Sequence, residues 1–431
     1  MHEIRNEQLQ LAAYHEQIEN GLDVYVIPKP GFAQTFALFT TKYGSIDREF
    51  VVPGETERTV VPDGIAHFLE HKMFEQESGE DVFNLFAKYG ASPNAFTSFD
   101  MTAYLFSSTI AVKENLDILL NYVQDPYFTD ENVEKEKGII GQEIRMYDDN
   151  PGWVVYFNLL RGFYKQHPIN IDIAGTVESI SKITKETLYK CYNTFYHPSN
   201  MNLVIVGDVD PAAIHAAVRD NQAQKDFTRQ PDIQRLLPEE GEEVAEPRVQ
   251  VEMVVSIPKI NFGYKDIKSS KLKGNDLLVN EYATAIGLEA LFGKSSTLFN
   301  RLYESGLVDK QFGWSYDVTP FYAHSVFGGN SPEPEKLLEA ITAAFAEAAD
   351  TGISAEDFER AKRKLIGQSL SDLDSPRAIC RQFSAYNLRG IDYFETVPVL
   401  ESLTLDQVNQ RLREHLRPEC FSASLVLPKK H

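Results

Sequence analysis

The sequence predicts a globular protein made of two similar halves, each of which combines β-strands with α-helices. Its 431 residues, 43% of them hydrophobic, are enough to bury more than one core. Apolar runs typical of buried strands occur at 22–27, 35–43 and 202–208, and a new strand pattern begins at 249–256. A helical pattern follows the third run at about 211–218.

Two pairs of segments indicate an internal duplication. Residues 139–144 (IIGQEI) resemble residues 365–370 (LIGQSL), and residues 67–75 resemble residues 296–304. The two offsets, 226 and 229 residues, are nearly equal. The alternative is a chance agreement between unrelated amphipathic helices.

A polar segment between the halves predicts the domain boundary. Residues 220–247 lack clear periodicity and contain Pro-Glu-Glu-Gly-Glu-Glu at 238–243, a composition typical of a linker. We therefore predict a first domain at 1–225, an acidic linker at 226–247 and a second domain at 248–431.

Composition argues against several classes of protein. The formal charge of −21 disfavours nucleic acid, whose phosphates require clustered Lys and Arg, and also an anionic membrane surface. No apolar run approaches the roughly 18 residues that span a bilayer, and the N-terminus lacks a signal-peptide pattern, so we expect a cytoplasmic protein. Three widely spaced cysteines (Cys191, Cys380 and Cys420) indicate buried thiols rather than disulfides.

The segment His67-Phe68-Leu69-Glu70-His71 is the most informative one. On an α-helix, imidazoles four residues apart project from one face at a separation suited to a single zinc ion, and Glu70 shares that face. The order H-x-x-E-H is the inverted form of a metallopeptidase motif whose Glu is the general base. A structural His pair is the alternative, but burying it in this apolar segment without a partner would be costly.

A catalytic zinc site has three protein ligands and one open position. Glu143, in a helical pattern at about 130–147, is the candidate third ligand. Glu136 lies two turns earlier on nearly the same face, where it can accept a hydrogen bond from the far nitrogen of a metal-bound imidazole. The alternative is an ordinary solvated glutamate, since this helix also carries Glu131 and Glu134.

Only the first half carries the candidate ligands. If the repeat is a duplication, the second half has the following residues at the corresponding positions: Ser296, Asn300 and Ser369. None of these offers an imidazole or a carboxylate, so we expect no equivalent metal site there.

These motifs resemble the insulinase family (M16), which includes pitrilysin, insulin-degrading enzyme and the mitochondrial processing peptidases. That family has H-x-x-E-H followed roughly 70 to 80 residues later by E-x6-E. Here the interval from His71 to Glu143 is 72 residues, and Glu136 precedes Glu143 by seven. Further similar stretches at 94–104 and 197–208 extend the resemblance over essentially the whole chain, nearest to the bacterial YmfH-like branch.

The resemblance implies roles for the residues of both motifs. His67, His71 and Glu143 would bind one Zn²⁺ ion per chain, Glu70 would be the catalytic base, and Glu136 would support a ligand. It also implies an α+β fold of two homologous domains, each a mostly antiparallel β-sheet backed by α-helices, arranged as a clam-like half chamber.

In the resembled family, the strand corresponding to residues 94–104 pairs with extended substrate. The residues implied to bind peptide are Asn94, Ala95, Phe96 and Thr97. Backbone pairing of this kind makes few demands on the peptide sequence. The alternative is that this stretch is an ordinary core strand.

One part of the family pattern is missing. Most active relatives supply an Arg and a Tyr, spaced R-x6-Y, from the second half. Here Tyr303 stands at the Arg position, Asp309 or Lys310 stands at the Tyr position, and Arg301 is offset. We therefore expect a heterodimer with a metal-less sibling that supplies the Arg and Tyr, with a homodimer as the alternative.

Together, these patterns predict a zinc-dependent endopeptidase that hydrolyses short or unfolded peptides. The alternative is a non-catalytic assembly or accessory protein of the same fold that retains zinc structurally. A structural role does not need a base beside an open metal position, so the intact Glu70 favours the enzyme.

Overall fold

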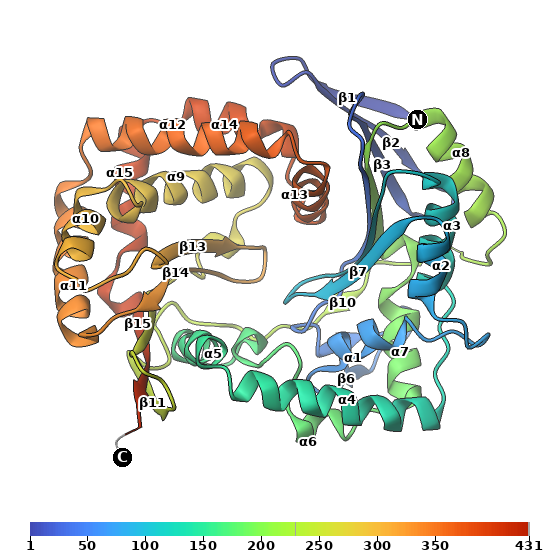
Figure 1. Cartoon of the computed structure of the whole chain (residues 1–431), viewed down its shortest axis with the longest axis horizontal. Helices are drawn as coiled ribbons and strands as arrows, with labels where there is room; N and C mark the ends of the chain where they lie inside the picture. Colours follow the sequence, from blue (N-terminus) through green and yellow to red (C-terminus); the bar gives the residue numbers. More distant parts are fainter. Residues whose placement is uncertain (229, 430–431) are drawn as a thin grey trace. The chain divides into compact units, whose positions relative to one another are not determined.

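The computed structural model describes residues 1–228 and 230–429, which form two compact units (Figure 1). Unit 1 contains three segments of the chain: 1–144, the described residues of 171–237, and 372–388. Unit 2 contains residues 145–170, residues 238–371 and the described residues from 389 onward. Each unit combines a sheet with helices, so the predicted α+β fold is confirmed. The clam-like arrangement stays a prediction.

Unit 1 is built on a seven-stranded sheet. Its strands, in spatial order, are β1 (His2–Asn6), β2 (Leu11–Gln17), β3 (Asp23–Pro28), β9 (Met201–Gly207), β4 (Thr35–Thr41), β8 (Thr102–Ser108) and β7 (Ala91–Thr97). All neighbours are antiparallel except β3 and β9. Strands β4 and β9 are buried along their whole length because apolar residues dominate both of their faces. Strand β7 lies at the edge, and among the described strands it pairs with β8 alone.

Helices cover both faces of this sheet. Figure 1 shows α13 on one side of the strands and α2, α3 and α8 on the other. The helices of unit 1 are α1 (Ile65–Lys72), α2 (Val82–Lys88), α3 (Val112–Val123), α4 (Asp130–Asp148), α6 (Val177–Ile180), α7 (Lys185–Phe195), α8 (Pro211–Gln222) and α13 (Pro376–Leu388). A small second sheet joins β10 (Gln234–Arg235), β5 (Glu49–Val51) and β6 (Arg58–Val60). The last turn of α4 already belongs to unit 2.

Unit 2 is built on a five-stranded sheet. Its strands, in spatial order, are β11 (Arg248–Met253), β15 (Phe421–Pro428), β12 (Lys259–Lys265), β14 (Ala323–Asn330) and β13 (Gly313–Val318). Its helices are α5 (Pro151–Phe163), α9 (Gly274–Phe292), α10 (Thr297–Glu304), α11 (Pro334–Thr351), α12 (Ala355–Asp372), α14 (Thr396–Ser402) and α15 (Leu405–His415). Strands β11 and β15 are parallel, and the other pairs are antiparallel.

The strand order reveals the duplication. Unit 1 contains the series β3-β9-β4-β8-β7, and unit 2 contains β11-β15-β12-β14-β13, with the parallel pair first in both. The helices of the two sequence echoes also correspond. Helices α1 and α10 have eight residues each, and α4 and α12 have 19 and 18. The predicted similarity of the two halves is confirmed.

The two units exchange one helix in each direction. Helix α5, which follows α4 in the chain, packs on β12 and β15 of unit 2. Helix α13, which follows α12, packs on β4 and β9 of unit 1. The two predicted domains are contiguous in sequence, so this exchange was not predicted.

The predicted linker, residues 226–247, contains ordered contacts. The side chain of Glu240 is 4% exposed and forms an ion pair of 2.7 Å with the fully buried Lys265. Its carboxylate also accepts hydrogen bonds from the backbone N–H groups of Gln166 and His167, at 2.8 and 2.9 Å. The boundary between the units falls after Leu237, inside this segment. Part of the segment is therefore built into unit 2.

The prediction of one strand over residues 94–104 is wrong. Strand β7 ends at Thr97 and β8 begins at Thr102, so the stretch forms a hairpin. The turn closes because the Ser98 N–H donates to the Met101 carbonyl at 2.8 Å, while the Ser98 hydroxyl donates to Asp100 at 3.1 Å. Apolar alternation cannot locate such a turn, because Phe99 inside it is also buried.

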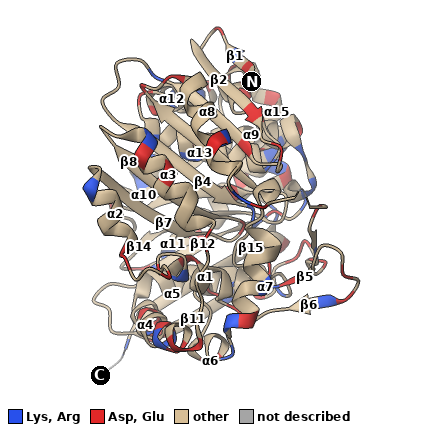
Figure 2. Ribbon diagram, turned by 90° about the vertical axis from the view of Figure 1, so that its right-hand side faces the viewer, with Lys and Arg blue, Asp and Glu red and all other residues tan. Residues whose placement is uncertain are grey.

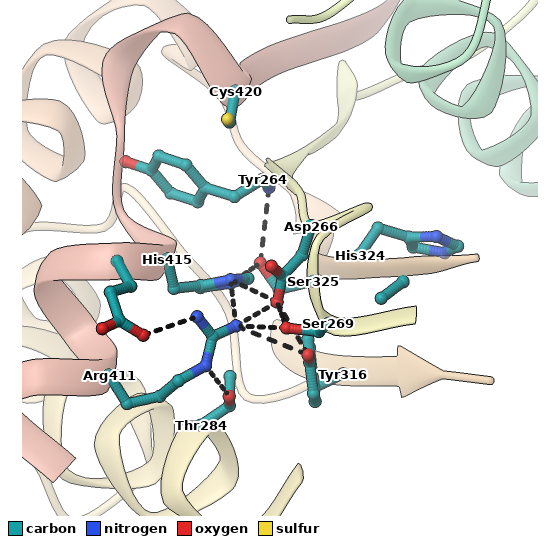
Figure 3. Close-up of polar contacts among 12 residues, drawn as sticks. Tyr264, Asp266, Ser269, Thr284, Tyr316, His324, Ser325, Arg411, His415 and Cys420 are labelled. Carbon is teal, nitrogen blue, oxygen red and sulfur yellow. Dashed lines mark hydrogen bonds and ion pairs between the residues drawn. The ribbon is translucent and has the colours of Figure 1, made fainter. Parts of the chain in front are cut away.

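A buried polar cluster joins α9 and α15 to the sheet of unit 2 (Figure 3). Arg411 forms an ion pair with Asp266 and donates to the Thr284 hydroxyl at 2.8 Å. The Asp266 carboxylate also accepts from the Tyr316 hydroxyl at 2.7 Å and contacts His415 at 3.2 Å. Burial alone would raise the pKa of Asp266, but Arg411 and His415 hold it below its usual value.

Arg411→Ala is expected to destabilise the protein by about 3–5 kcal/mol, because it leaves the buried Asp266 charge without its main partner. Arg413→Ala, on the exposed side of the same helix, is the matched control and should change stability by less than about 0.5 kcal/mol. Urea unfolding at pH 7 measures both variants. Equal midpoints for Arg411→Ala and the wild type would contradict this account of the cluster.

The charged residues, the helices and the cysteines can each be compared with what the composition predicted. On the view in Figure 2, Lys and Arg are interspersed with Asp and Glu. None of the described helices combines the length and the apolar character that crossing a bilayer requires. The three cysteines are free and buried, as predicted.

Candidate metal centre

Helix α1 is fixed at both its start and its buried face. It begins after Gly64, which has φ = 89°, and a Cβ there would lie 2.3 Å from the Ala174 carbonyl oxygen. Glycine is therefore required for this close approach. The side chains of Ile65, Phe68 and Leu69 are buried and anchor the helix. The spacing of 3.6 residues per turn then turns His67 and His71 to the same side.

The structure brings the three predicted ligands together. The ligand atoms of His67, His71 and Glu143 all lie within 4.8 Å of one another. The Nε2 atom of His67 is 3.8 Å from one Glu143 oxygen, and the Nε2 atom of His71 is 3.7 Å from the other. The two imidazoles come from α1 and the carboxylate comes from α4.

These distances fit a tetrahedral zinc site. Zinc–nitrogen and zinc–oxygen bonds of roughly 2.0–2.2 Å at a tetrahedral angle place neighbouring ligand atoms roughly 3.4 Å apart. The observed 3.7 and 3.8 Å are a few tenths longer, a difference that small side-chain movements can close. The donor set of two imidazoles and one carboxylate is typical of catalytic zinc, which keeps a fourth position open.

Glu136 lies beside His71 rather than in the ligand group. One of its carboxylate oxygens is 3.0 Å from the Nδ1 atom of His71, and its side chain is 7% exposed. Burial lowers the pKa of His71, but the hydrogen bond to Glu136 and the charge of Glu70 outweigh it, so the pKa is raised. With Nδ1 held by Glu136, Nε2 points toward Glu143.

His67 is more deeply buried than His71. Burial, together with the neighbouring His71, lowers the pKa of His67 to about 4. The ring is therefore neutral at pH 7 and has a lone pair available for a metal ion. Its Nδ1 atom is buried without a hydrogen-bond partner among the described residues, so no hydrogen bond at that atom orients the ring.

Glu70 lies next to the ligands, and β7 holds it in place. The Thr97 hydroxyl donates to its carboxylate at 2.6 Å. Burial raises the pKa of Glu70, and the bond from Thr97 partly offsets this. A carboxylate with a raised pKa is better suited to take up and release a proton near neutral pH. The contact between Thr97 and Glu70 was not predicted, because it joins residues 27 positions apart through tertiary packing.

Lys72 is a second unpredicted contributor. Its side chain is fully buried, and its ammonium lies 2.7 Å from Glu75 and 3.4 Å from the backbone carbonyl of Asn132 in α4. This contact ties α1 to the helix that carries Glu143. The sequence shows only that a lysine directly follows the motif. It does not show that this lysine is buried.

The residues at the missing Arg and Tyr positions have local roles in unit 2. Asp309 accepts hydrogen bonds from the backbone N–H groups of Gln311 and Phe312, and from the side chain of Asn330. Tyr303 is 39% exposed and stacks on Phe299. At the duplicated metal positions, Ser296 caps α10 and Asn300 donates to the Ser296 carbonyl.

Two family models match the chain in succession. The model described as insulinase (peptidase family M16) matches residues 54–177, and the one described as peptidase M16 inactive domain matches residues 182–365. The uncharacterized zinc protease YmfH of Bacillus subtilis is 51% identical over 426 residues, covering 99% of both chains. The chain belongs to the insulinase family. The candidate ligands all lie within the segment that the first family model matches.

The chain is also similar to other proteins in sequence and in fold. The uncharacterized zinc protease YmxG of Bacillus subtilis is 23% identical over 87% of this chain and 91% of its own. A crystal structure of an M16-like peptidase from Alicyclobacillus acidocaldarius has a TM-score of 0.94 and 43% identity, covering 99% of this chain and all of the other. A protease from Helicobacter pylori shares the fold, with a TM-score of 0.80 and 18% identity over 96% and 99% of the two chains.

Glu136→Gln is expected to weaken zinc affinity about 10- to 100-fold, because the amide is a poorer acceptor for the Nδ1–H of His71. Glu134→Gln is the matched control, since Glu134 is exposed on the same helix and pairs with Lys137. Competition with a chromophoric chelator measures both affinities. If Glu136→Gln binds zinc as tightly as Glu134→Gln does, Glu136 does not support a metal ligand.

Proposed function

We propose that the chain is a zinc-dependent endopeptidase that hydrolyses short or unfolded peptides. The observation that carries this proposal is the convergence of His67, His71 and Glu143, with Glu70 beside them and bonded to Thr97. In this proposal each chain holds one zinc ion on those three side chains. The names of the relatives as zinc proteases support it.

The chain's own residues would divide the work of hydrolysis. A zinc ion, when bound, supplies Lewis acidity that activates a water molecule and polarises the scissile carbonyl. Glu70 takes the proton from the attacking water and passes it to the leaving amine, and Thr97 keeps its carboxylate oriented. Glu136 holds His71 so that Nε2 stays directed at the site. The raised pKa of Glu70 suits both halves of this proton transfer.

The edge strand β7 is the proposed binding place for the peptide. Asn94, Ala95, Phe96 and Thr97 lie on this strand, which leaves the backbone groups of its free edge available for pairing. Because Thr97 contacts Glu70, a peptide added to this edge runs past the base. Such pairing selects extended chains, which is why short or unfolded peptides are the proposed substrates.

The chain lacks the family's Arg and Tyr, so we propose a partner that supplies them. The partner would be a metal-less relative, and the pair would form a heterodimer in the cytoplasm. Donors for the developing oxyanion contribute about 2.7–4 kcal/mol to such reactions, so their loss is kinetically severe. This partner explains how a chain with intact ligands but without those donors could be fully active.

Glu70→Gln is expected to keep zinc bound but to lower kcat for peptide hydrolysis by about 10²- to 10⁴-fold, because the amide cannot accept the proton. Zinc content and turnover of a quenched fluorescent peptide are measured on the same sample. Glu77→Gln, an exposed residue beyond α1, is the control. Unchanged turnover in Glu70→Gln would contradict the role of Glu70 as the base. Absence of turnover in the wild type, with and without a partner, would favour a non-catalytic protein with structural zinc.

Addition of the metal-less relative is expected to raise kcat/KM of the purified chain by about 10²-fold or more, because it restores the oxyanion donors. Replacing the Arg and Tyr of that relative should abolish the increase without preventing association, which gel filtration verifies. Full activity of this chain alone, unaffected by the relative, would contradict the heterodimer.

A further inference from the structure

The two faces of β7 differ in what they contact. Thr97 faces Glu70, and Phe96, the preceding residue, points to the opposite face because side chains alternate along a strand. In the sheet register, Phe96 lies beside Ala103 of β8, which in turn lies beside Thr40 of β4. A peptide that extends the sheet at β7 would therefore present alternate side chains to the base and to the Phe96 face.

Helix α13 is fixed on the Phe96 face. The hydroxyl of Ser384 donates to the Asn202 side-chain carbonyl at 2.9 Å and is hydrogen-bonded to the Thr40 hydroxyl at 3.0 Å, and all three residues are buried. A further bond of 2.9 Å joins Asn202 to Asn387. These contacts set the position of α13 before any peptide binds, so the side chains on its exposed side are held in fixed register with the sheet.

Arg381 extends from α13 to the edge strand. Its guanidinium carbon lies 4.7 Å from the centre of the Phe96 ring, and the residue is exposed. Among the described residues, it forms no ion pair within 4 Å. Stacking on an aromatic face positions a guanidinium while leaving its in-plane N–H groups available for a carboxylate. A cation is thus held beside the substrate edge without an internal partner.

We propose that Arg381 is a specificity-determining residue that selects peptides with an Asp or Glu side chain at the position beside Phe96. This inference rests on the proposed peptidase function. Since Phe96 is adjacent to the residue that contacts Glu70, the selected position lies within about two residues of the cleaved bond. The carboxylate of that side chain accepts N–H bonds from the guanidinium.

The overall charge of −21 does not oppose this local preference. At physiological ionic strength the Debye length is about 8 Å, so acidic groups elsewhere on the surface are largely screened from the peptide. A charge-assisted hydrogen bond acts at contact and is screened less. The exposed setting of Arg381 limits the gain to about tenfold in affinity or kcat/KM.

Arg377 provides a matched control. It lies one turn earlier on the same exposed side of α13, and its guanidinium carbon is 5.6 Å from the centre of the Phe36 ring. Phe36 belongs to β4, an inner strand of the sheet, rather than to the edge. The two arginines therefore share exposure and ring contact but differ in whether they reach the edge where the peptide would pair.

The test uses peptides blocked at both ends, so that no terminal carboxylate is present. Each position from three residues before to three residues after the cleaved bond carries Glu, Gln or Lys in turn. In the wild-type chain with its partner, kcat/KM at one position is expected to favour Glu over Gln about tenfold. Arg381→Met should reduce this ratio to about one, Arg381→Glu should favour Lys, and Arg377→Met should behave as the wild type.

Binding of the same peptides to Glu70→Gln, measured by fluorescence anisotropy, tests the inference without turnover. A tenfold preference for the Glu peptide that disappears with the added Arg381→Met change would support it. Cleavage with no Glu preference, or a preference that survives Arg381→Met, would overturn it while leaving the peptidase proposal intact. If the wild type neither binds nor cleaves any peptide, both proposals fail. Urea unfolding verifies that each variant is folded.

Discussion

The candidate site depends on how firmly the short helix α1 is held against its surroundings. Eight residues cannot form a stable helix by themselves, so the position of His67 and His71 comes from tertiary contacts. The close approach at Gly64 fixes the start of the helix, and the buried Lys72 ties its end to α4. Through α4, the same contact places Glu143 opposite the two imidazoles. The metal geometry is therefore a consequence of packing between two helices.

Unit 2 has the same arrangement of strands and helices as unit 1 but lacks the candidate metal ligands. Unit 2 repeats the strand order and the two helices, but Ser296 and Asn300 at the duplicated positions serve the local structure of α10. One cluster of its buried polar groups, around Asp266 and Arg411, joins helices to the sheet. Unit 1 thus carries the three candidate metal ligands, while the duplicated positions in unit 2 serve the local structure of α10.

Local patterns in the sequence predicted the candidate site better than they predicted the connections of the fold. The spacing of His67 and His71 and the periodicity around Glu143 are properties of single helices, and the family resemblance linked them. Contacts such as Thr97 with Glu70 depend on a strand and a helix meeting in three dimensions. Hydrophobic periodicity in the sequence reveals neither the exchange of α5 and α13 between the units nor the burial of the Glu240 side chain. Similar amphipathic and acidic segments also occur in solvated positions.

Zinc-edge X-ray absorption of the purified, zinc-loaded chain tests the central claim most directly. The account predicts one zinc ion per chain, with two imidazole nitrogens and a carboxylate oxygen at about 2.0–2.2 Å and no sulfur, since the three cysteines are buried elsewhere. It also predicts that the bound zinc is lost when His71 is replaced by Ala. A spectrum with sulfur neighbours, or stoichiometric zinc retained by His71→Ala, would contradict the proposed metal centre.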